Sequence, residues 1–422
     1  MDTIFALSSG APPAAIAVMR ISGPHTANAV RSLAGKLPAP RRASLVSLRD
    51  KAGSKLDQAL ILWFPGPASA TGEDCAEFHL HGGRAIVSAV ETALGEVDSL
   101  RPARPGEFTR RSFANGRIDL AQAEGLADLL EAETELQRRS AMALASGALS
   151  EKVTTWREEV LVLSALVESA LDFADEDDVD PLPSDFTAKL SALAGELADW
   201  LERPRARALK EGYRVALAGP PNAGKSTLFN ALVESEAAIA SPTAGTTRDV
   251  LTRSVALGGI PLTFVDMAGL RDESSDDIEA IGIGRARDEM VRADLVLWLG
   301  PEGEGPDSSW EIEPRIDQGD VLKASPDYRI SAVSGRGMDE LRSAIMAHAR
   351  GAMPKPGDVA LNERQSGLIA EAADALRGDV PDDLLILGEN LRVGRSAFDR
   401  LIGRSGTEDM LDALFGRFCI GK

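Results

Sequence analysis

The stretch GPPNAGKS, residues 219–226, decides how the centre of this chain folds. The apolar run YRVALAG leads into it, and the segment STLFNALVES that follows has the spacing of a helix. A strand, a glycine-rich loop that ends in Gly-Lys-Ser, and a helix form the pattern that cradles phosphates. Its glycines let backbone N–H groups approach phosphate oxygens, and the helix N-terminus adds positive potential. We therefore expect Lys225 to contact β- and γ-phosphate oxygens and Ser226 to bind Mg²⁺.

The residues around this loop alternate between strand and helix. LTFVDMAG, DLVLWLG and YRISAVSG are short apolar runs separated by polar or helical segments, and TRSVALGGIPLTFVD indicates a hairpin that turns at Gly258-Gly259. Helical periodicity dominates before this region, from Leu120 onward, and again after Pro354. Residues 1–118 instead combine short apolar runs with Gly and Pro punctuation and one helical run, RAIVSAVETAL.

The predicted fold is therefore a multidomain α/β and α protein. We expect an N-terminal α+β domain over 1–118, a first helical segment over 119–211, an inserted Ras-like P-loop domain over 212–347, and a second helical segment over 348–422. The length of 422 residues suits roughly three domains.

Composition limits the cell compartment and the partners. Two cysteines cannot form a disulfide framework, no apolar run reaches the ~18 residues of a membrane span, and MDTIFALSSG lacks the basic flank of a signal peptide. We expect a cytoplasmic protein. The net charge of −19 argues against a simple nucleic-acid coat, but residues 1–118 carry 14 Lys and Arg against 10 Asp and Glu. An anionic partner would bind most easily to this N-terminal third.

The order of motifs after the phosphate loop favours GTP over ATP. AGTTRD, residues 244–249, offers Thr247 as a second magnesium ligand, and DMAG, residues 266–269, ends an apolar strand. The guanine-reading N-K-x-D motif is not visible, and RIDQGDVL stands in its place. Asp320 could accept hydrogen bonds from the guanine ring N–H and amino group, with Asp317-Gln318 in place of Asn-Lys. The segment SAV, residues 331–333, fits the backbone that contacts guanine O6.

Hydrolysis requires groups other than the usual glutamine after D-x-x-G, because that position holds Leu270. Asn222 could place its carbonyl on a monovalent cation that acts where an arginine finger otherwise does. Glu279 is a candidate to orient water, although a solvated residue at a helix start is the simpler interpretation.

Two further stretches leave alternatives open. In CAEFHLH, residues 75–81, four potential zinc ligands share one face of a strand, but they point in parallel and cannot close a tetrahedron unaided. The C-terminal FCIGK, residues 418–422, is either a loose tail or a functional segment.

Several motifs together resemble one family. They are AVMRISG, GEDCAEFHLHGG, RPGEFTRRSFANGRIDLAQAEGLADLL, GPPNAGKS, AGTTRD, DMAGLRD, IEAIGIGRA, SAVSGRGMDEL and the terminal FCIGK. They are similar to the MnmE (TrmE) family of tRNA modification GTPases, and the resemblance runs from end to end. It implies an N-terminal domain that binds folate and dimerises, a helical domain made from two chain segments, and an inserted G domain. In the family, potassium promotes the contact between the two G domains of the dimer.

The resemblance also implies cofactors and partners. These are GTP, Mg²⁺, K⁺ and a 5-formyl- or 5,10-methylene-tetrahydrofolate. The family works with the flavoprotein MnmG (GidA), which carries FAD and uses NADH, in a heterotetramer or larger complex. Together they place a carboxymethylaminomethyl or aminomethyl group on C5 of the wobble uridine of tRNA.

Site residues carry over by position. The folate site would use Arg20, Glu77, Arg117 and Lys422, with Arg117 where many relatives have lysine. Glu279 would be the catalytic glutamate, and Cys419 either a nucleophile or an essential non-covalent residue. Ser226 and Thr247 would bind Mg²⁺, and K⁺ would be held by Asn222, Ser241, Thr243 and Thr246. The expected GTP contacts are Asn222, Ala223, Gly224, Lys225, Ser226, Thr227, Ser241, Pro242, Thr243, Ala244, Gly245, Thr246, Thr247, Asp266, Met267, Ala268, Gly269, Asp320, Ser331, Ala332 and Val333.

Two other functions compete with this one. A ribosome-assembly or RNA-binding GTPase would share the phosphate loop, but such proteins typically add a clearly basic RNA-binding domain, whereas the helical segments here are acidic. An interaction scaffold with a decaying G domain would explain the missing Asn-Lys. The intact Lys225, Ser226, Thr247 and Asp266 count against that scaffold.

Overall fold

The computed structural model describes residues 2–172, 182–203, 206–233, 251–267, 289–319, 323–355, 357–378, 383–405 and 408–422. The chain divides into two compact units. The first unit contains Met1–Ala127, Ala145–Glu158 and Arg395–Lys422, and the second contains Asp128–Leu144 and Glu159–Gly394. Each unit is described by itself below.

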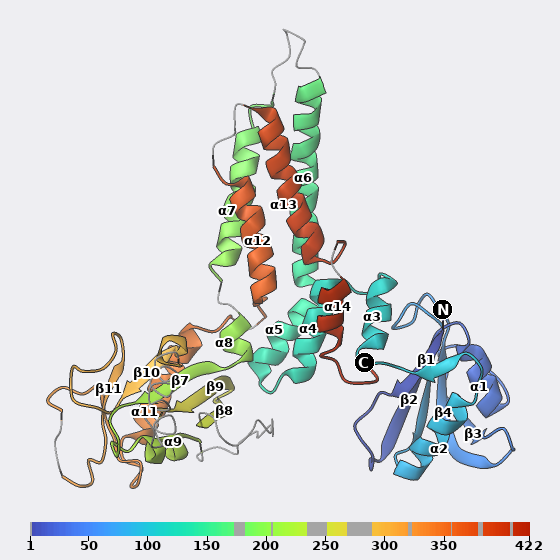
Figure 1. Ribbon diagram of the computed structural model, residues 1–422, viewed down its shortest axis with the longest axis horizontal. Coiled ribbons are helices and arrows are strands. Elements are labelled where there is room, and N and C mark those ends of the chain that lie inside the picture. Colours follow the sequence, from blue (N-terminus) through green and yellow to red (C-terminus); the bar gives the residue numbers. More distant parts are fainter. Residues whose placement is uncertain are drawn as a thin grey trace, which may run out of the picture. The chain divides into compact units, whose positions relative to one another are not determined.

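A six-stranded sheet forms the centre of the first unit (Figure 1). Its strands are β1 Thr3–Leu7, β2 Ile16–Ser22, β3 Ser44–Arg49, β4 Lys55–Phe64, β5 Cys75–His81 and β6 Leu100–Pro102. The order is β3-β4-β5-β2-β1-β6, and every neighbouring pair is antiparallel except β1 and β6.

One face of this sheet is covered by two helices, and the other carries polar site residues. Helices α1, Thr26–Ala34, and α2, Arg84–Gly95, share one hydrophobic core with the strands. In β5, Phe78 and Leu80 are buried in that core, whereas Glu77 and His79 alternate with them onto the opposite face. Because side chains alternate between the two faces of a strand, only every second side chain of β5 lies on the face that a ligand could contact.

The helical segments come from both sides of residues 212–347. They are α3 Glu107–Ala114, α4 Leu120–Glu131, α5 Glu135–Ala145, α6 Ala148–Asp172, α7 Phe186–Leu201, α8 Ala206–Lys210, α12 Glu363–Leu376, α13 Leu384–Leu401 and α14 Glu408–Phe415.

Each unit pairs a helix that precedes the insertion with one that follows it. In the first unit, the ring centroids of Trp156 on α6 and Phe398 on α13 are 5.8 Å apart, and Arg157 binds Asp399 at 2.7 Å. In the second unit, α7 packs along α12 (Figure 1). The prediction of a discontinuous helical domain interrupted by an α/β domain is confirmed.

A second six-stranded sheet carries the phosphate loop. Its elements are β7 Tyr213–Ala218, α9 Lys225–Val233, β8 Leu251–Leu257, β9 Ile260–Asp266, β10 Leu295–Trp298, β11 Trp310–Glu313, β12 Tyr328–Arg329 and α11 Met338–Gly351. The order is β12-β11-β10-β7-β9-β8, with β8 antiparallel to β9 and the other neighbours parallel. The chain continues from β7 to one side and later returns to the other, so β7 is the switch point where such sheets bind ligands.

The local predictions for this sheet are largely confirmed. Leu257 pairs with Ile260 across the hairpin at Gly258-Gly259. The strand expected in YRISAVSG is shorter than the apolar run, because the Ser331 N–H donates to Arg336 O and the chain turns there. The division at 118, 211 and 347 stays a prediction. Within the described ranges, none of the helices combines the length and apolarity that a membrane span needs.

Candidate functional sites

Lys225 lies inside the phosphate loop, as its position in the motif predicts. Its side chain is 6% exposed, and Nζ donates hydrogen bonds of 3.0 Å to Gly219 O and 2.8 Å to Pro220 O. Asn222 and Gly224 both have positive φ angles, of 62° and 98°, which curl the loop tightly. The ammonium group therefore lies inside the curled phosphate loop, bonded to two of its carbonyl oxygens, next to the N-terminus of α9.

The predicted magnesium ligand Ser226 meets Asp266, the aspartate of the DMAG motif. Ser226 Oγ lies 2.7 Å from Asp266 Oδ2, and Asp266 is fully buried at the end of β9. Strand β9 runs beside β7, so Asp266 at the end of β9 lies near Ser226, which is in the first turn of α9 after the loop that follows β7. A hydroxyl and a carboxylate at hydrogen-bonding distance form the oxygen-rich environment that Mg²⁺ prefers next to phosphates.

Two turns meet at the carboxyl end of β11. Pro314 follows this strand, the Ile316 N–H donates to Ile330 O at 3.2 Å, and Ser331 comes next. Asp317 is exposed and follows Ile316, which is bonded to the residue before the predicted SAV contact. Sequence reasoning had assigned the base contact to Asp320, which lies outside the described residues. It also missed Arg315, whose Nη2 donates a 2.5 Å hydrogen bond to Asn222 O.

Several other predicted GTP-site residues fall outside the described ranges, and nothing is said of their placement. They are residues 241–247, with the potassium candidates Ser241, Thr243 and Thr246 and the magnesium candidate Thr247, and also Ala268, Gly269 and the catalytic candidate Glu279. Met267, the last described residue of DMAG, is buried on the sheet face that also holds Ala216 and Val296. Val333 is 82% exposed, and Ala332 is half-buried.

The first unit holds the second site, on the open face of the N-terminal sheet. Arg20 on β2 and Glu77 on β5 are direct partners in the strand register. Arg20 Nε and Nη2 both contact Glu77 Oε1, at 3.1 and 2.9 Å, and both side chains keep about a quarter of their surface exposed, 25% and 21%. Glu77 Oε2 lies 3.5 Å from His79 Nε2, so this second oxygen retains capacity to accept hydrogen bonds from a ligand.

The C-terminal residues are held against the same part of the sheet. Ser8 Oγ donates 2.7 Å to Gly421 O, and the Phe108 N–H donates 3.2 Å to Lys422 O. The Phe108 ring also lies 5.7 Å beneath the guanidinium of Arg20. Figure 1 shows the C-terminus between α3 and β1. Phe108 thus contacts both Lys422, through its backbone N–H, and Arg20, through its ring, and the loose-tail alternative is wrong.

The remaining predicted residues of this site differ in their surroundings. Cys419 is exposed, and its carbonyl oxygen accepts 3.5 Å from Gly106 N–H and 3.2 Å from Lys422 N–H. Arg117 is exposed and its side chain passes beside Gly72, in the loop before β5. The structure therefore places Arg20 and Lys422 in contact with Phe108, with Glu77 bonded to Arg20, and places Arg117 at the loop before β5. Phe108 belongs to the quoted PGEFT motif, which was the available signal for it.

The zinc alternative for CAEFHLH is not supported. The thiol of Cys75 is buried 3.0 Å from Thr71 Oγ1, and His81 Nδ1 pairs with Asp57 Oδ1 at 2.7 Å. No group of three metal-binding side chains occurs among the residues described here. Burial by itself would raise the pKa of Asp57, but hydrogen bonds from the His81 N–H, the His81 ring and the Gln58 N–H outweigh it and lower that pKa.

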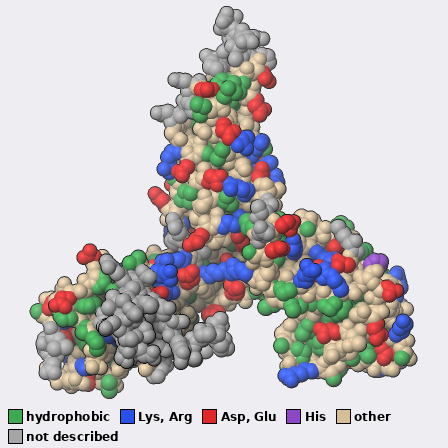
Figure 2. All heavy atoms as spheres, in the orientation of Figure 1, with side chains coloured by type: hydrophobic (Ala, Val, Ile, Leu, Met, Phe, Trp, Pro, Cys, Tyr) green, Lys and Arg blue, Asp and Glu red, His purple; other side chains and the backbone are tan. Residues whose placement is uncertain are grey.

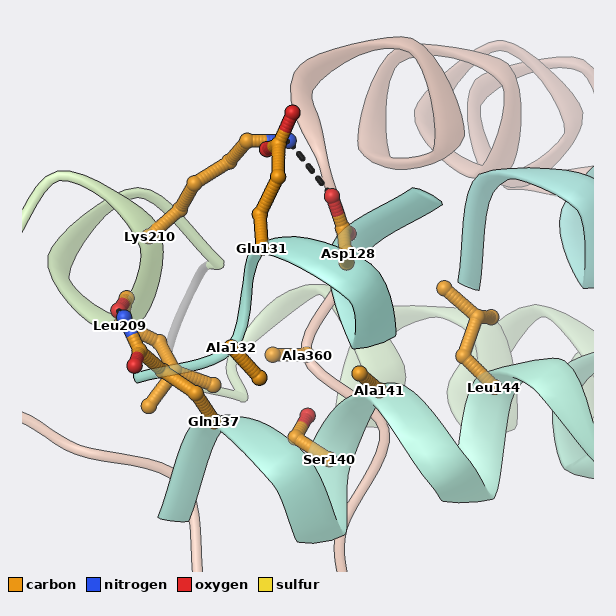
Figure 3. A pocket seen from close by; sticks show the side chains of 10 residues that line it. All are labelled: Asp128, Glu131, Ala132, Gln137, Ser140, Ala141, Leu144, Leu209, Lys210 and Ala360. Atoms are coloured by element: carbon orange, nitrogen blue, oxygen red, sulfur yellow. Dashed lines mark hydrogen bonds and ion pairs between the residues drawn. The ribbon is translucent and has the colours of Figure 1, made fainter. Parts of the chain in front are cut away.

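A hollow of about 70 Å³ lies in the second unit, where helices meet both connections to the α/β domain (Figure 3). The polar side chains that line it form hydrogen bonds and an ion pair with other residues of this chain. Lys210 Nζ contacts Asp128 Oδ1 at 2.5 Å, Gln137 Nε2 donates 2.9 Å to Leu209 O, and Ser140 Oγ donates 3.0 Å to the carbonyl of residue 358. Helix α5 is thereby bonded to the segment that enters the α/β domain and to the one that leaves it.

The strand order, the loop after β7 and the Ser226–Asp266 pair define a P-loop nucleotide hydrolase with an added N-terminal α+β domain and helical part. Known proteins agree with this architecture. Residues 3–117 match the family described as "GTP-binding protein TrmE N-terminus", and residues 120–419 match "MnmE helical domain".

Full-length relatives lead to the same family. A tRNA modification GTPase MnmE of Novosphingobium aromaticivorans is 61% identical over 435 residues, and one of Erythrobacter litoralis is 61% identical over 427, each alignment covering 100% of both chains. A third, from Zymomonas mobilis, is 47% identical with the same coverage. The chain belongs to the MnmE family of tRNA modification GTPases, and it is a GTP hydrolase that acts in tRNA modification. The resemblance inferred from the motifs is confirmed.

Proposed function

We propose that this GTPase is potassium-dependent and works as a cytoplasmic homodimer with the flavoprotein MnmG (GidA). The pair would place an aminomethyl or carboxymethylaminomethyl group on C5 of the wobble uridine of tRNA, drawing the carbon from a tetrahydrofolate one-carbon unit. FAD and NADH would serve on the partner. One observation carries this proposal: the terminal Lys422 is bonded to Phe108, whose ring lies against Arg20 of the Arg20–Glu77 pair, in a chain that also has an intact phosphate loop.

The folate assignment is supported by the chemistry of the donor set. A pterin presents an amino group and ring N–H groups, which need a carboxylate acceptor, and Glu77 Oε2 has that capacity. The glutamate tail of a folate is anionic, and Arg20, Lys422 and the exposed Arg117 supply cations at the same domain. When bound, the folate would supply the one-carbon unit, and these residues would orient it.

The GTP-site roles extend the described geometry. Ser226 and Asp266, joined by Thr247, would hold Mg²⁺, which neutralises developing phosphate charge. Lys225 would exchange its bonds to Gly219 O and Pro220 O for phosphate oxygens. Asn222 with Ser241, Thr243 and Thr246 would bind K⁺, and Glu279 would orient the attacking water. For base recognition we propose Asp317 as a candidate in addition to Asp320. The residue before Asp317, Ile316, is bonded to Ile330, which precedes the turn at Ser331.

The competing function is a ribosome-assembly or RNA-binding GTPase. Figure 2 shows Lys and Arg side chains interspersed with Asp and Glu along the helical part of the visible face, without a single basic surface. Phosphate-dominated RNA binding requires clustered cations, so this face favours the first proposal. Binding of tRNA would then depend on the partner flavoprotein or on the N-terminal third.

The decisive experiment is mass spectrometry of wobble uridines in tRNA from a deletion strain complemented with this chain. Wild type should restore the modification. Cys419→Ser should abolish it while GTP hydrolysis by the purified variant stays normal. Ile420→Ala is the matched control, because its side chain is 58% exposed in the same tail. Unmodified tRNA in the wild-type complement, or normally modified tRNA in the deletion strain, would contradict the proposal.

A further inference from the structure

Helix α3 contacts two separate parts of the N-terminal site. At its start, the Phe108 N–H donates a 3.2 Å hydrogen bond to the carbonyl oxygen of Lys422. Just past its other end, Asn115 Nδ2 donates a 2.7 Å hydrogen bond to Thr71 O. Thr71 belongs to the loop before β5, which comprises residues 65–74. One short helix therefore sets the separation between the C-terminal segment and this loop.

Arg111, on the same helix, joins three segments of the domain. Its Nη1 lies 3.1 Å from Glu73 Oε2 in the loop before β5. Its Nη2 donates 2.8 Å to Asp2 Oδ1 and 3.2 Å to Glu107 Oε1. Burial by itself would lower the pKa of Arg111, but its ion pairs with Glu73 and Glu107 outweigh it and raise that pKa. The planar guanidinium fork can serve several carboxylates in fixed directions, which an ammonium group does less well.

Of the three carboxylates, Glu73 depends most on Arg111. Asp2 and Glu107 also bind Arg101, at 2.5 and 2.8 Å. Among the residues that the structure describes, Glu73 has no second cationic partner. Its side chain is only 14% exposed, so removal of Arg111 would leave a largely buried carboxylate without a countercharge. The loop before β5 would then have to move for Glu73 to reach water.

This loop also forms the surface beside which Arg117 lies. A Cβ placed on Gly72, the residue before Glu73, would lie 3.3 Å from Arg117 Cγ. The Arg117 N–H donates 2.8 Å to Ser112 O, so its backbone is fixed to α3. Arg117 is exposed, and a long side chain loses rotamer freedom when it binds a ligand. A loop that is held in place restricts those rotamers beforehand, which lowers the cost of binding.

We propose that Arg111 is a positioning residue for the glutamate tail of the folate: by holding Glu73 and its loop against α3, it places the Arg117 side chain for the tail carboxylates. Arg111 acts through Arg117, because its own guanidinium is occupied by three protein carboxylates. The inference rests on the proposed folate function and makes it more specific. The contact between α3 and the loop governs recognition of the glutamate tail, whereas Glu77 on β5 is assigned to the pterin.

The experiment measures calorimetric affinities for 5-formyltetrahydrofolate and for 5-formyltetrahydropteroate, which lacks the glutamate. Arg111→Ala should weaken binding of the first roughly tenfold, the loss of about one hydrogen bond to a charged group, and leave the second unchanged. Glu73→Gln, which keeps the shape of the side chain and removes its charge, should cause a smaller loss with the same selectivity. Arg31→Ala, at an exposed position on α1, is the control and should match wild type with both ligands.

A double substitution tests the route of the effect. Arg117→Ala should show the same selective loss, and adding Arg111→Ala to it should cause no further loss, because two residues that act through one contact are not additive. A further loss in the Arg117→Ala background would mean that Arg111 acts by another route and would overturn the inference.

The remaining outcomes are equally decisive. Full affinity for both ligands in a folded Arg111→Ala protein, or an equal loss for both, would overturn the inference, since a general structural role affects the two ligands alike. If Arg111→Ala does not fold, as judged by thermal unfolding, Glu73→Gln decides: a selective loss supports the inference, and wild-type affinity for 5-formyltetrahydrofolate overturns it. Absence of binding of either ligand by wild type would contradict the proposed folate function, and the inference with it.

Discussion

The side-chain hydroxyl of Ser8 donates a 2.7 Å hydrogen bond to the carbonyl oxygen of Gly421, 413 positions later in the chain. Gly421 has a φ of 96°, and a Cβ placed on it would lie 2.1 Å from Leu7 O. The end of β1 therefore accepts the C-terminal segment only because residue 421 has no side chain. This contact determines where Cys419 and Lys422 lie.

The first prediction concerns this docked tail. Gly421→Ala should displace the tail, because the added methyl group overlaps the backbone of β1 and an alanine resists the positive φ. Folate binding, measured by calorimetry, should fall at least tenfold, whereas GTP hydrolysis should remain unchanged. Gly10→Ala is the control, since no atom lies within 4 Å of a Cβ at that position. Equal folate affinity in both variants would show that the tail does not contribute to that site.

The second prediction concerns the Ser226–Asp266 pair. Ser226→Ala removes the hydroxyl that lies 2.7 Å from Asp266 Oδ2, and thereby one of the oxygens proposed to bind Mg²⁺. The turnover number for GTP should fall by about two orders of magnitude, on the scale of losing one transition-state electrostatic contact. A magnesium titration should show a higher half-saturating concentration. A reduced rate with an unchanged magnesium dependence would assign Ser226 a role other than metal binding.

The third prediction separates the two candidate base readers. An aspartate accepts hydrogen bonds from the N1–H and 2-amino group of guanine, whereas an asparagine can donate to the 2-oxo group of xanthine. If Asp317 contacts the base, Asp317→Asn should bind GDP at least tenfold more weakly and xanthosine diphosphate more tightly, as measured by competition. Asp320→Asn is made in parallel. A switch in base preference caused by Asp320→Asn and not by Asp317→Asn would restore the assignment made from the sequence.

The fourth prediction concerns Asp57 and pH. Hydrogen bonds from His81 and Gln58 lower the pKa of Asp57, so its stabilising contribution is present above the ordinary carboxyl pKa of about 4 and is lost as the pH falls through the lower, folded-state value. Asp57→Asn should reduce the free energy of unfolding by about 1–3 kcal/mol at pH 7, the cost of disrupting hydrogen bonds to a buried group. The difference from wild type should shrink at pH values below about 4. Urea unfolding measures it.

The control for this fourth prediction is Asp98→Asn, at an exposed position of the same domain. It should leave the unfolding free energy within about 0.5 kcal/mol of wild type at each pH, as expected for a surface substitution. A difference between Asp57→Asn and wild type that stays constant from neutral to acid pH would mean that the charge of Asp57 contributes nothing to stability.

The sequence predicted those features that depend on residues close together in the chain. The phosphate loop needs Gly224 at a φ of 98° and a lysine at the helix start, and both stand within the eight-residue motif. The hairpin at Gly258-Gly259 and the alternation of Phe78 and Glu77 across β5 follow from turn chemistry and from the period of two. Each is a local property of the backbone.

The base-side turn could not be predicted in the same way. Without an N-K-x-D motif, spacing and residue type alone favoured Asp320 as the residue that contacts the guanine base. Which residue leaves β11 toward the phosphate loop depends on where the strand ends, and strand ends are set by pairing with β10 and β12. The contact between Arg315 and Asn222 carries no signal in adjacent residues, because Asn222 belongs to a different strand–loop–helix unit.

The sequence by itself determined the phosphate-binding loop, the helical segments on either side of it, and the family. Only the tertiary structure decided that FCIGK is docked, that Phe108 lies between Arg20 and Lys422, and that Arg315 holds Asn222. The physical reason is the range of the interactions. Backbone conformation and periodicity are dictated by adjacent residues, whereas contacts between distant residues form only after the strands have paired and the helices have packed on them.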